Sequence, residues 1–219
     1  MAASAAKLKP GALIDLGRRE YVEVWELQKQ LVEQRQRDAI VDTLLLVEHP
    51  DVITLGRRLK ASANVLAPGD IPVIEVERGG DVTYHGPGQL VGYPILKLSE
   101  DERDLHGYLR NLEEALIGVC ADVGLEGRRN PGWTGAWIGA RKVASLGIAV
   151  RRWVTLHGFA LNVATDLSRF TTINPCGLES AVMTSLAIET GRPLTLADVK
   201  PLAIAQLGRT LGRDFVLTR

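Results

Sequence analysis

Two segments of the chain carry apolar residues at helical spacing. The first stripe crosses residues 20–37, which are otherwise rich in Gln, Glu and Arg, and predicts an amphipathic helix. Its members are Tyr21, Val24, Trp25, Leu31 and Val32. The second stripe crosses residues 103–122 and predicts a helix with one buried face. Its members are Leu105, Tyr108, Leu109, Leu112, Leu116, Val119 and Cys120.

Elsewhere the apolar residues fall into short β-rich runs separated by turn residues, which predicts strands. The runs are residues 40–47, 52–55, 73–76 and 90–96. Residues 133–163 return to strand character with a Trp- and Gly-rich stretch, followed by the runs 143–150 and 154–163. Because helices and strands interleave, we expect an α/β (α+β) fold, a mixed β-sheet flanked by helices.

The ends of the chain are read from turn and cap residues. A third helix is expected over roughly residues 178–189. Asp198 is expected to be the N-cap of a last helix, because Pro201 is tolerated in a first turn. Residues 1–10 are expected to be a flexible tail, and residues 11–219 a single domain.

The composition is that of an ordinary globular protein, with 46% hydrophobic and 24% charged residues. Twenty-six basic residues balance twenty-six acidic ones, so the total charge favours neither nucleic acid nor membrane. The N-terminal residues lack the apolar run of a signal peptide, and the apolar stretches elsewhere are too short to span a bilayer. With only two cysteines, Cys120 and Cys176, a disulfide framework is not expected, and we predict a cytoplasmic protein.

The familiar cofactor motifs do not occur. The sequence holds no GxxxxGK[ST] loop and no GxGxxG after a strand, and its four histidines and two cysteines have no metal-ligand spacing. We therefore expect no cofactor and no metal.

Glycine-rich polar sequence at residues 78–89 is the first candidate for chemistry. Four glycines and a proline in twelve residues indicate a close approach of the backbone to a bound group, and Arg, Thr, Tyr, His and Gln supply polar contacts. A long hairpin turn with solvated polar groups explains the same composition.

Cys176 is the second candidate, because it stands between Pro175 and Gly177, before the predicted third helix. A thiol at a helix N-terminus is easier to ionise, although most unpaired cysteines are simply buried apolar residues. Cys120 lies on the apolar stripe of its helix and is assigned to the core.

Lys142 and His157 complete the candidates. Lys142 stands at the head of an apolar strand, where its side chain either extends to solvent or, in a central strand, becomes an amine with a lowered pKa that serves as a base. His157 lies in the polar start of the last strand run, and such a histidine alone is more often a hydrogen-bonded structural residue than a catalyst.

Together these segments resemble the lipoyl/octanoyl transferase family. Its pattern R-G-G-x-x-T-[aromatic]-H-x-x-G-Q-x-[apolar]-x-Y is filled from Arg78 through Tyr93. The segment 48–57, the Lys142 strand and the segments 155–162 and 173–177 also match, in order. The resemblance covers about residues 12–190. It implies the fold of biotin and lipoate protein ligases, Cys176 as acyl carrier and Lys142 as its acid/base partner. The acyl site that it implies comprises Arg78, Gly79, Gly80, Asp81, Val82, Thr83, Tyr84, His85, Ser145, Leu146, Gly147, Gly158, Phe159 and Ala160.

The resemblance also implies the partners. The donor would be octanoyl-acyl carrier protein, and the acceptor a lysine of a lipoyl domain, as in glycine-cleavage H protein or 2-oxoacid dehydrogenase E2 subunits. Thioester exchange followed by amide formation needs no ATP, in line with the missing phosphate loop. Burial of six methylenes would contribute roughly 5 kcal/mol to binding. Two alternatives stay open: an ATP-dependent lipoate or biotin ligase, and a silent acyl- or lipoyl-domain-binding protein.

Basic residues come in pairs that a strongly acidic carrier protein could meet. The pairs are Arg57 with Arg58, Arg128 with Arg129, and Arg151 with Arg152. Each pair alone is explained by solvation, but Arg57 and Arg58 follow a family-matched turn, so we expect them to flank the mouth of the pocket.

Overall fold

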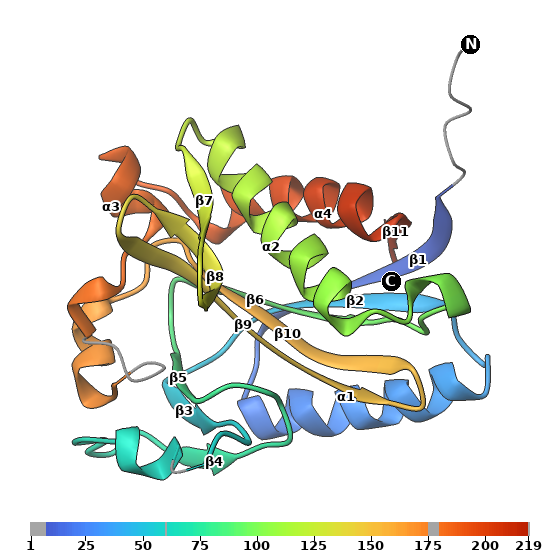
Figure 1. Ribbon diagram of the computed structural model, residues 1–219, viewed down its shortest axis with the longest axis horizontal. Helices are drawn as coiled ribbons and strands as arrows, with labels where there is room; N and C mark the ends of the chain where they lie inside the picture. Colours follow the sequence, from blue (N-terminus) through green and yellow to red (C-terminus); the bar gives the residue numbers. More distant parts are fainter. Residues whose placement is uncertain (1–7, 60, 175–179, 219) are drawn as a thin grey trace.

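Eight strands of the described chain form one sheet in the order β11-β1-β2-β6-β10-β9-β8-β7. The computed structural model describes residues 8–59, 61–174 and 180–218 (Figure 1). β1 runs parallel to β2 and β11, and the other neighbours are antiparallel, so the predicted mixed sheet is confirmed. The strands are β1 Lys9–Arg18, β2 Asp42–Glu48, β6 Gln89–Ile95, β7 Gly127–Asn130, β8 Trp133–Ile138, β9 Arg141–Arg151, β10 Val154–Asn162 and β11 Arg213–Leu217.

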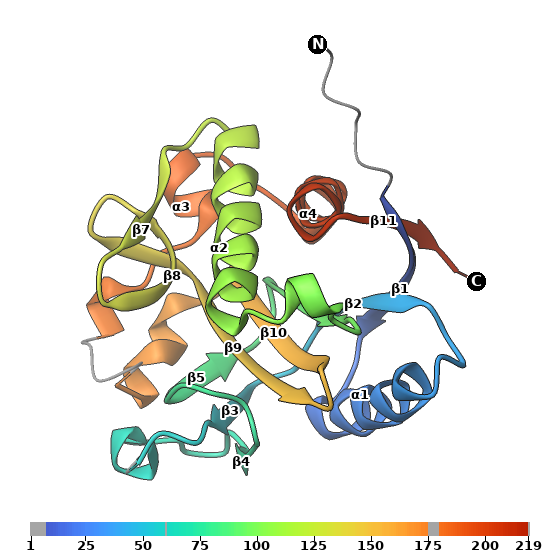
Figure 2. The ribbon, with the colours of Figure 1, turned by 45° about the vertical axis from the view of Figure 1, so that its right-hand side comes forward.

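Helices cover both faces of this sheet (Figure 2). α1 (Tyr21–Gln36) packs on one face, and α2 (Leu105–Asp122) and α4 (Leu196–Leu211) pack on the other. All four residues 44–47 of β2 are buried, although successive side chains of a strand point to opposite faces, because helices cover both faces of the sheet. Leu44 and Leu46 therefore join the α2 and α4 side, and Leu45 and Val47 join the α1 side.

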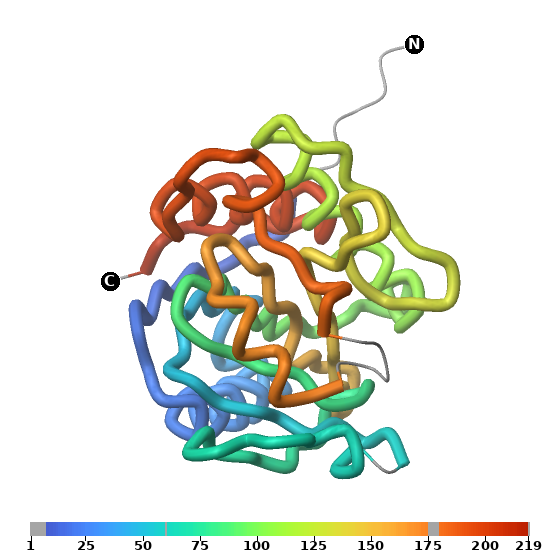
Figure 3. The backbone as a smooth tube through the Cα atoms, turned by 90° about the vertical axis from the view of Figure 1, so that its left-hand side faces the viewer, coloured from blue at the N-terminus to red at the C-terminus, as the bar shows by residue number. Residues whose placement is uncertain are grey.

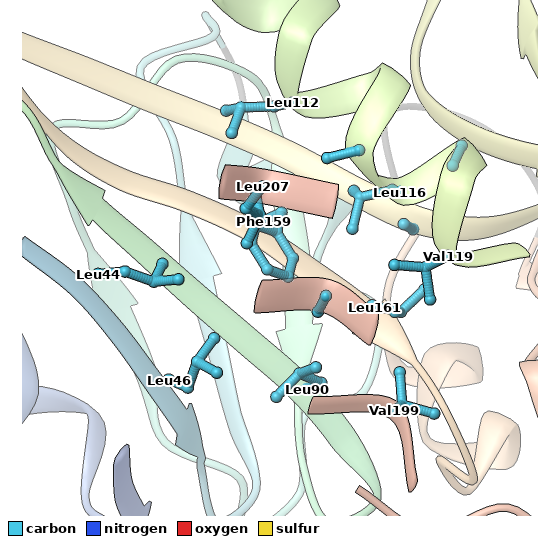
Figure 4. Packing of buried hydrophobic residues seen from close by; sticks show 14 of the residues in the cluster. Leu44, Leu46, Leu90, Leu112, Leu116, Val119, Phe159, Leu161, Val199 and Leu207 are labelled. Atoms are coloured by element: carbon cyan, nitrogen blue, oxygen red, sulfur yellow. The ribbon is translucent and has the colours of Figure 1, made fainter. Parts of the chain in front are cut away.

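Figure 4 shows the larger of the two resulting cores. Leu112 and Leu116 of α2 and Leu207 of α4 meet Phe159 and Leu161 of β10, all almost without exposed surface. Removal of one such leucine side chain typically costs about 2–5 kcal/mol. This core holds β9 and β10 in place, and these two strands carry half of the candidate site.

A second, small sheet carries the other half. Its order is β4-β3-β5, with β3 at Val52–Leu55, β4 at Val73–Glu75 and β5 at Val82–His85. Ile53 and Val82 pack against Phe170 and Ile173, so this sheet lies beside the chain around residues 167–173 (Figure 3). The remaining short turns are η1 Ala61–Asn64, η2 Glu100–Glu102, η3 Leu167–Thr172 and η5 Ser180–Val182.

The expected N-cap of the last helix was wrong by one turn. Thr195 is the N-cap of α4, since its hydroxyl accepts from the Asp198 amide while the Asp198 carboxylate accepts from the Thr195 amide at 2.8 Å. This reciprocal pair is a capping box. Pro201 consequently lies inside α4, beyond the first turn to which the prediction confined it.

The prediction of a helix over 178–189 is also wrong within the described residues 180–189. Residues 180–189 contain the short turn η5 and then α3 (Leu186–Thr190), which starts only after the Ser185 N-cap. The backbone between them pairs elsewhere: Met183 forms a bridge with Lys142, and the Thr184 amide donates to the Lys142 carbonyl at 2.9 Å. Residues 178 and 179 lie outside the described residues.

The tail prediction is wrong at its inner end. Lys9 and Pro10 belong to β1 and pair with Arg213 and Asp214 of β11, two elements that the sequence patterns did not predict. Residues 1–7 lie outside the described residues. Among the helices that are described, none is long and apolar enough to cross a membrane.

Candidate active site

A cleft lies between the small sheet and the β9–β10 pair of the main sheet. Lys142 and twelve of the fourteen expected acyl-site residues line it. The twelve are Arg78, Gly80, Asp81, Val82, Thr83, His85, Ser145, Leu146, Gly147, Gly158, Phe159 and Ala160. Segments far apart in the sequence thus meet in one cleft. The candidate residues of β9 and β10 lie side by side because Gly147 pairs with Gly158 and Ser145 pairs with Ala160.

The two exceptions follow from backbone geometry. Tyr84 lies outside this cleft, buried among the apolar residues of the small sheet, with its ring 5.2 Å from that of Phe170 and its hydroxyl donating to Asp51 at 2.5 Å. Gly79 lines a neighbouring cavity instead, and its amide donates to the Ile148 carbonyl at 2.8 Å. This bond ties the 78–80 segment to β9.

Lys142 is buried, with 3% of its surface exposed, at the start of β9. Its Nζ lies 5.7 Å from the centre of the Trp137 ring, and its backbone bridges to Met183. The sequence left open whether this side chain reaches solvent, and the structure resolves that choice in favour of burial. A buried amine beside the cleft is available for proton transfer to a group bound there.

A chain of hydrogen bonds runs from Arg78 toward the Lys142 strand. Arg78 donates to the Thr54 hydroxyl at 3.0 Å, which leaves the Thr54 proton for His85 Nε2 at 3.4 Å. His85 Nδ1 faces the Gln89 side-chain oxygen at 2.9 Å and must therefore donate to it. Burial lowers the pKa of His85 to about 3, so the ring is neutral and can accept at Nε2.

The chain continues through two amides in the same direction. Gln89 donates to the Asn162 side-chain oxygen at 2.9 Å, and Asn162 donates to the Thr184 carbonyl at 3.0 Å. The Thr184 amide then donates to the Lys142 carbonyl. One ordered network therefore joins the small sheet, β6, β10 and the segment after residue 180 to the backbone of Lys142.

Three further residues line the cleft that the expected site omitted: Tyr21, Tyr93 and His157. Tyr93 belongs to the matched pattern, but Tyr21 was read only as part of an apolar stripe, and no signal in the sequence separated it from core residues. Burial raises the pKa of both tyrosines, so both rings are un-ionised.

The histidines around the cleft are neutral. His49 Nδ1 donates to the Arg19 carbonyl, its Nε2 accepts from Tyr93 at 2.8 Å, and burial lowers the pKa of His49 to about 4. His157 has a left-handed backbone (φ 58°) and 1% exposure, and burial lowers its pKa although the Glu77 carboxylate lies 3.4 Å from Nε2. The described residues contain no cluster of three or more His, Cys, Asp or Glu that could hold a metal ion.

Of the two cysteines, Cys120 lies within the described residues. Cys120 is fully buried in the core under α2, as predicted, and burial raises the pKa of its thiol to about 12. Cys176, with the Pro175 and Gly177 that frame it, lies outside the described residues. The chain on its N-terminal side is anchored, because the Asn174 amide donates to the Asn64 carbonyl at 2.8 Å.

Comparison with known proteins gives the class of this fold and cleft. Residues 20–208 match the model of the lipoyl protein ligase A/B catalytic domain. A lipoate protein ligase from Thermoplasma acidophilum, solved within an archaeal lipoylation system, has a TM-score of 0.75 at 18% identity and covers 96% of this chain and 87% of its own. A biotin protein ligase from Aquifex aeolicus has a TM-score of 0.51 at 14% identity, covering 93% and 69%. These two show the fold, as expected.

Comparison of amino-acid sequences identifies a narrower family than comparison of folds does. A protein of Geobacter metallireducens named octanoyltransferase is 53% identical over 186 residues, which are 85% of this chain and 86% of that protein. The chain belongs to the octanoyltransferase family, and it is an acyltransferase.

Proposed function

We propose that this protein takes an octanoyl group from octanoyl-acyl carrier protein, holds it as a thioester on Cys176, and passes it to a lysine of a lipoyl domain. Octanoyl transfer in protein lipoylation is the activity of the family. The thioester, the carrier-protein donor and acceptors such as H protein and E2 subunits are the finer parts of the proposal. We also propose that the chain from Lys9 onward acts as one domain in the cytoplasm.

The observation that carries the proposal is the burial of Lys142 at a cleft lined by apolar and glycine residues. Leu146, Phe159 and Ala160 offer an apolar wall for an acyl chain, and Lys142 is the one lysine among the described residues of the lining. Cys120 is a poor nucleophile because its thiol is fully buried and its pKa is raised. Of the two cysteines in the chain, Cys176 is therefore the candidate carrier.

The chemistry balances without an added reactant. The Cys176 sulfur attacks the octanoyl carbonyl, the bond to the donor sulfur breaks, and Lys142 moves the Cys176 proton to the leaving thiol. The acceptor amine then attacks the same carbonyl and expels the Cys176 sulfur, while Lys142 takes a proton from the amine and passes it to that sulfur. The first step exchanges one thioester for another, and the second forms a more stable amide.

Denaturing mass spectrometry after incubation with octanoyl-carrier protein tests this function. The wild-type protein and Cys120→Ala should gain one octanoyl group, and Cys176→Ala should gain none and should not modify a lipoyl domain. Retained transfer in Cys176→Ala would exclude the thioester route. Product formed from free octanoate only when ATP is present would indicate a ligase instead, and binding without any adduct would indicate a silent binding protein.

A further inference from the structure

A second cavity opens beside the cleft and reaches the same lysine. The two cavities share five wall residues, namely Gly80, Asp81, Lys142, Leu146 and Gly147. Lys142 therefore stands where the two spaces meet. An acyl chain that fills the first cavity would have its carbonyl end near this junction.

The second cavity has a wall of its own with a distinct chemistry. Leu109 of α2, Trp133 of β8 and Ile148 of β9 supply half-buried apolar surface, and Thr134 supplies a hydroxyl. Arg58 lines the same cavity with 58% of its side chain exposed. A molecule that enters here thus meets a positive charge and then an amphipathic wall before it reaches Lys142.

The backbone of Arg58 is fixed to the candidate site. Its amide donates to the Gly80 carbonyl at 3.0 Å, and its guanidinium lies 3.6 Å from the Asp81 carboxylate. Asp81 already accepts two hydrogen bonds from the Asn64 amide, at 2.9 and 3.0 Å, and one from the Val82 amide at 2.7 Å. Because this carboxylate is well satisfied without Arg58, the guanidinium can pair with another anion.

We infer that the second cavity receives the thiol arm of the acyl donor, with Arg58 beside a phosphate on that arm. The inference rests on the proposed function. The acyl chain occupies one side of the carbonyl, so the leaving thiol must depart from the other side. A phosphorylated arm with amide and methyl groups fits a cavity with an arginine at one end and Leu109, Trp133 and Ile148 along its wall.

Small octanoyl thioesters separate the parts of this inference. Octanoyl-4′-phosphopantetheine carries arm and phosphate, octanoyl-pantetheine carries the arm alone, and the octanoyl thioester of N-acetylcysteamine carries neither. Arg58→Gln should raise KM for the phosphorylated donor about fivefold, the size expected of one exposed ion pair, and leave the other two unchanged. Leu109→Trp should narrow the cavity and raise KM for both arm-bearing donors while it spares the short one.

Arg57 provides the matched control, because it carries the same charge one residue away but does not line the second cavity. It lines a hollow with Trp25, Glu75 and Glu77, which Arg58 also borders. Arg57→Gln should leave all three KM values unchanged. The inference would be overturned if KM rose equally in both arginine variants or equally with all three donors. It would also be overturned if no KM changed in Arg58→Gln. If the wild-type protein gains an octanoyl group from none of the donors, the proposed function itself fails, and the inference fails with it.

Discussion

Gly135 leaves the space that the Lys142 side chain occupies. A Cβ atom placed on Gly135 would lie 2.7 Å from Cε of Lys142 and 2.5 Å from the Ala144 carbonyl oxygen. The Gly135 backbone has φ +146°, which residues with a side chain rarely adopt, and its amide donates to the buried Glu113 carboxylate at 2.9 Å. The position of the proposed acid/base group therefore depends on the absence of a side chain one strand away.

We expect Gly135→Ala to slow acylation of Cys176 strongly, because the added methyl group displaces Lys142. The positive φ should also cost at least about 1 kcal/mol of stability. Gly139→Ala is the control, since Gly139 also has a positive φ (+56°) but no atom within 4 Å of its Cβ position. Denaturation curves and adduct formation with octanoyl-carrier protein measure both effects. Equal activity in the two variants would show that Gly135 does not position Lys142.

Lys142→Met keeps the apolar stem and removes the amine. We expect this variant to fold and to lose a factor of about 10²–10⁴ in acylation of Cys176 and in transfer to a lipoyl domain. Arg141→Met is the control, because Arg141 is the preceding residue but pairs with Glu189 at 2.9 Å on the surface. Activity is followed as a function of pH in each variant. A pH–rate profile and thiol reactivity like those of the wild-type protein would assign Lys142 a structural role only.

The sequence was most informative where chemistry restricts residue type. The pattern from Arg78 to Tyr93, the strand at Lys142 and the segment 155–162 together placed twelve expected residues in one cleft. The sequence was less informative about which way each side chain points. Tyr84 and His85 are adjacent on β5, and only the path of the strand directs His85 to the cleft. Tyr21 was missed for a similar reason, since an aromatic residue on an apolar stripe looks the same whether it meets core or cleft.

Helix boundaries failed where long-range contacts outweigh local preference. Residues 180–189 have helical character, yet Met183 and Thr184 bind to the Lys142 backbone, which fits neither a helix nor the expected start at residue 178. β1 and β11 were missed because each is completed by a partner about 200 residues away in the chain, which no local pattern reports.

Arg213 holds β11 to the rest of the sheet through buried ion pairs. It has 3% exposure, and its guanidinium donates to Asp42 at 2.9 Å and to both oxygens of Glu102. Arg213→Met leaves the buried Asp42 short of one partner, so we expect a loss of about 3–5 kcal/mol in unfolding free energy. Arg209→Met, on the exposed face of α4, should cost less than about 1 kcal/mol. Urea titrations of both variants measure this difference, and equal stability would contradict the assignment.

Buried neutral histidines should make the protein sensitive to acid. The pKa of His49 is lowered to about 4 and that of His85 to about 3, whereas an unfolded histidine titrates near pH 6.5. Below pH 6.5 these histidines bind protons in the unfolded state but not in the folded state. The free energy of unfolding is therefore highest above pH 6.5 and falls as the pH drops toward the folded pKa values. At pH 5 the loss amounts to about 2 kcal/mol for each histidine.

Substitution by glutamine tests this dependence, because a glutamine keeps one donor and one acceptor but does not titrate. His49→Gln should weaken the protein at pH 7, where Arg19 and Tyr93 lose ideal partners. The slope of its unfolding free energy between pH 6.5 and 5 should nevertheless be smaller than that of the wild-type protein, because one of three buried neutral histidines no longer contributes. His106→Gln, at an exposed position on α2, should keep the wild-type slope. Urea titrations across this pH range measure the slopes. An unchanged slope in His49→Gln would mean that the buried ring is protonated in the folded protein, and the neutral state assigned to it would have to be abandoned.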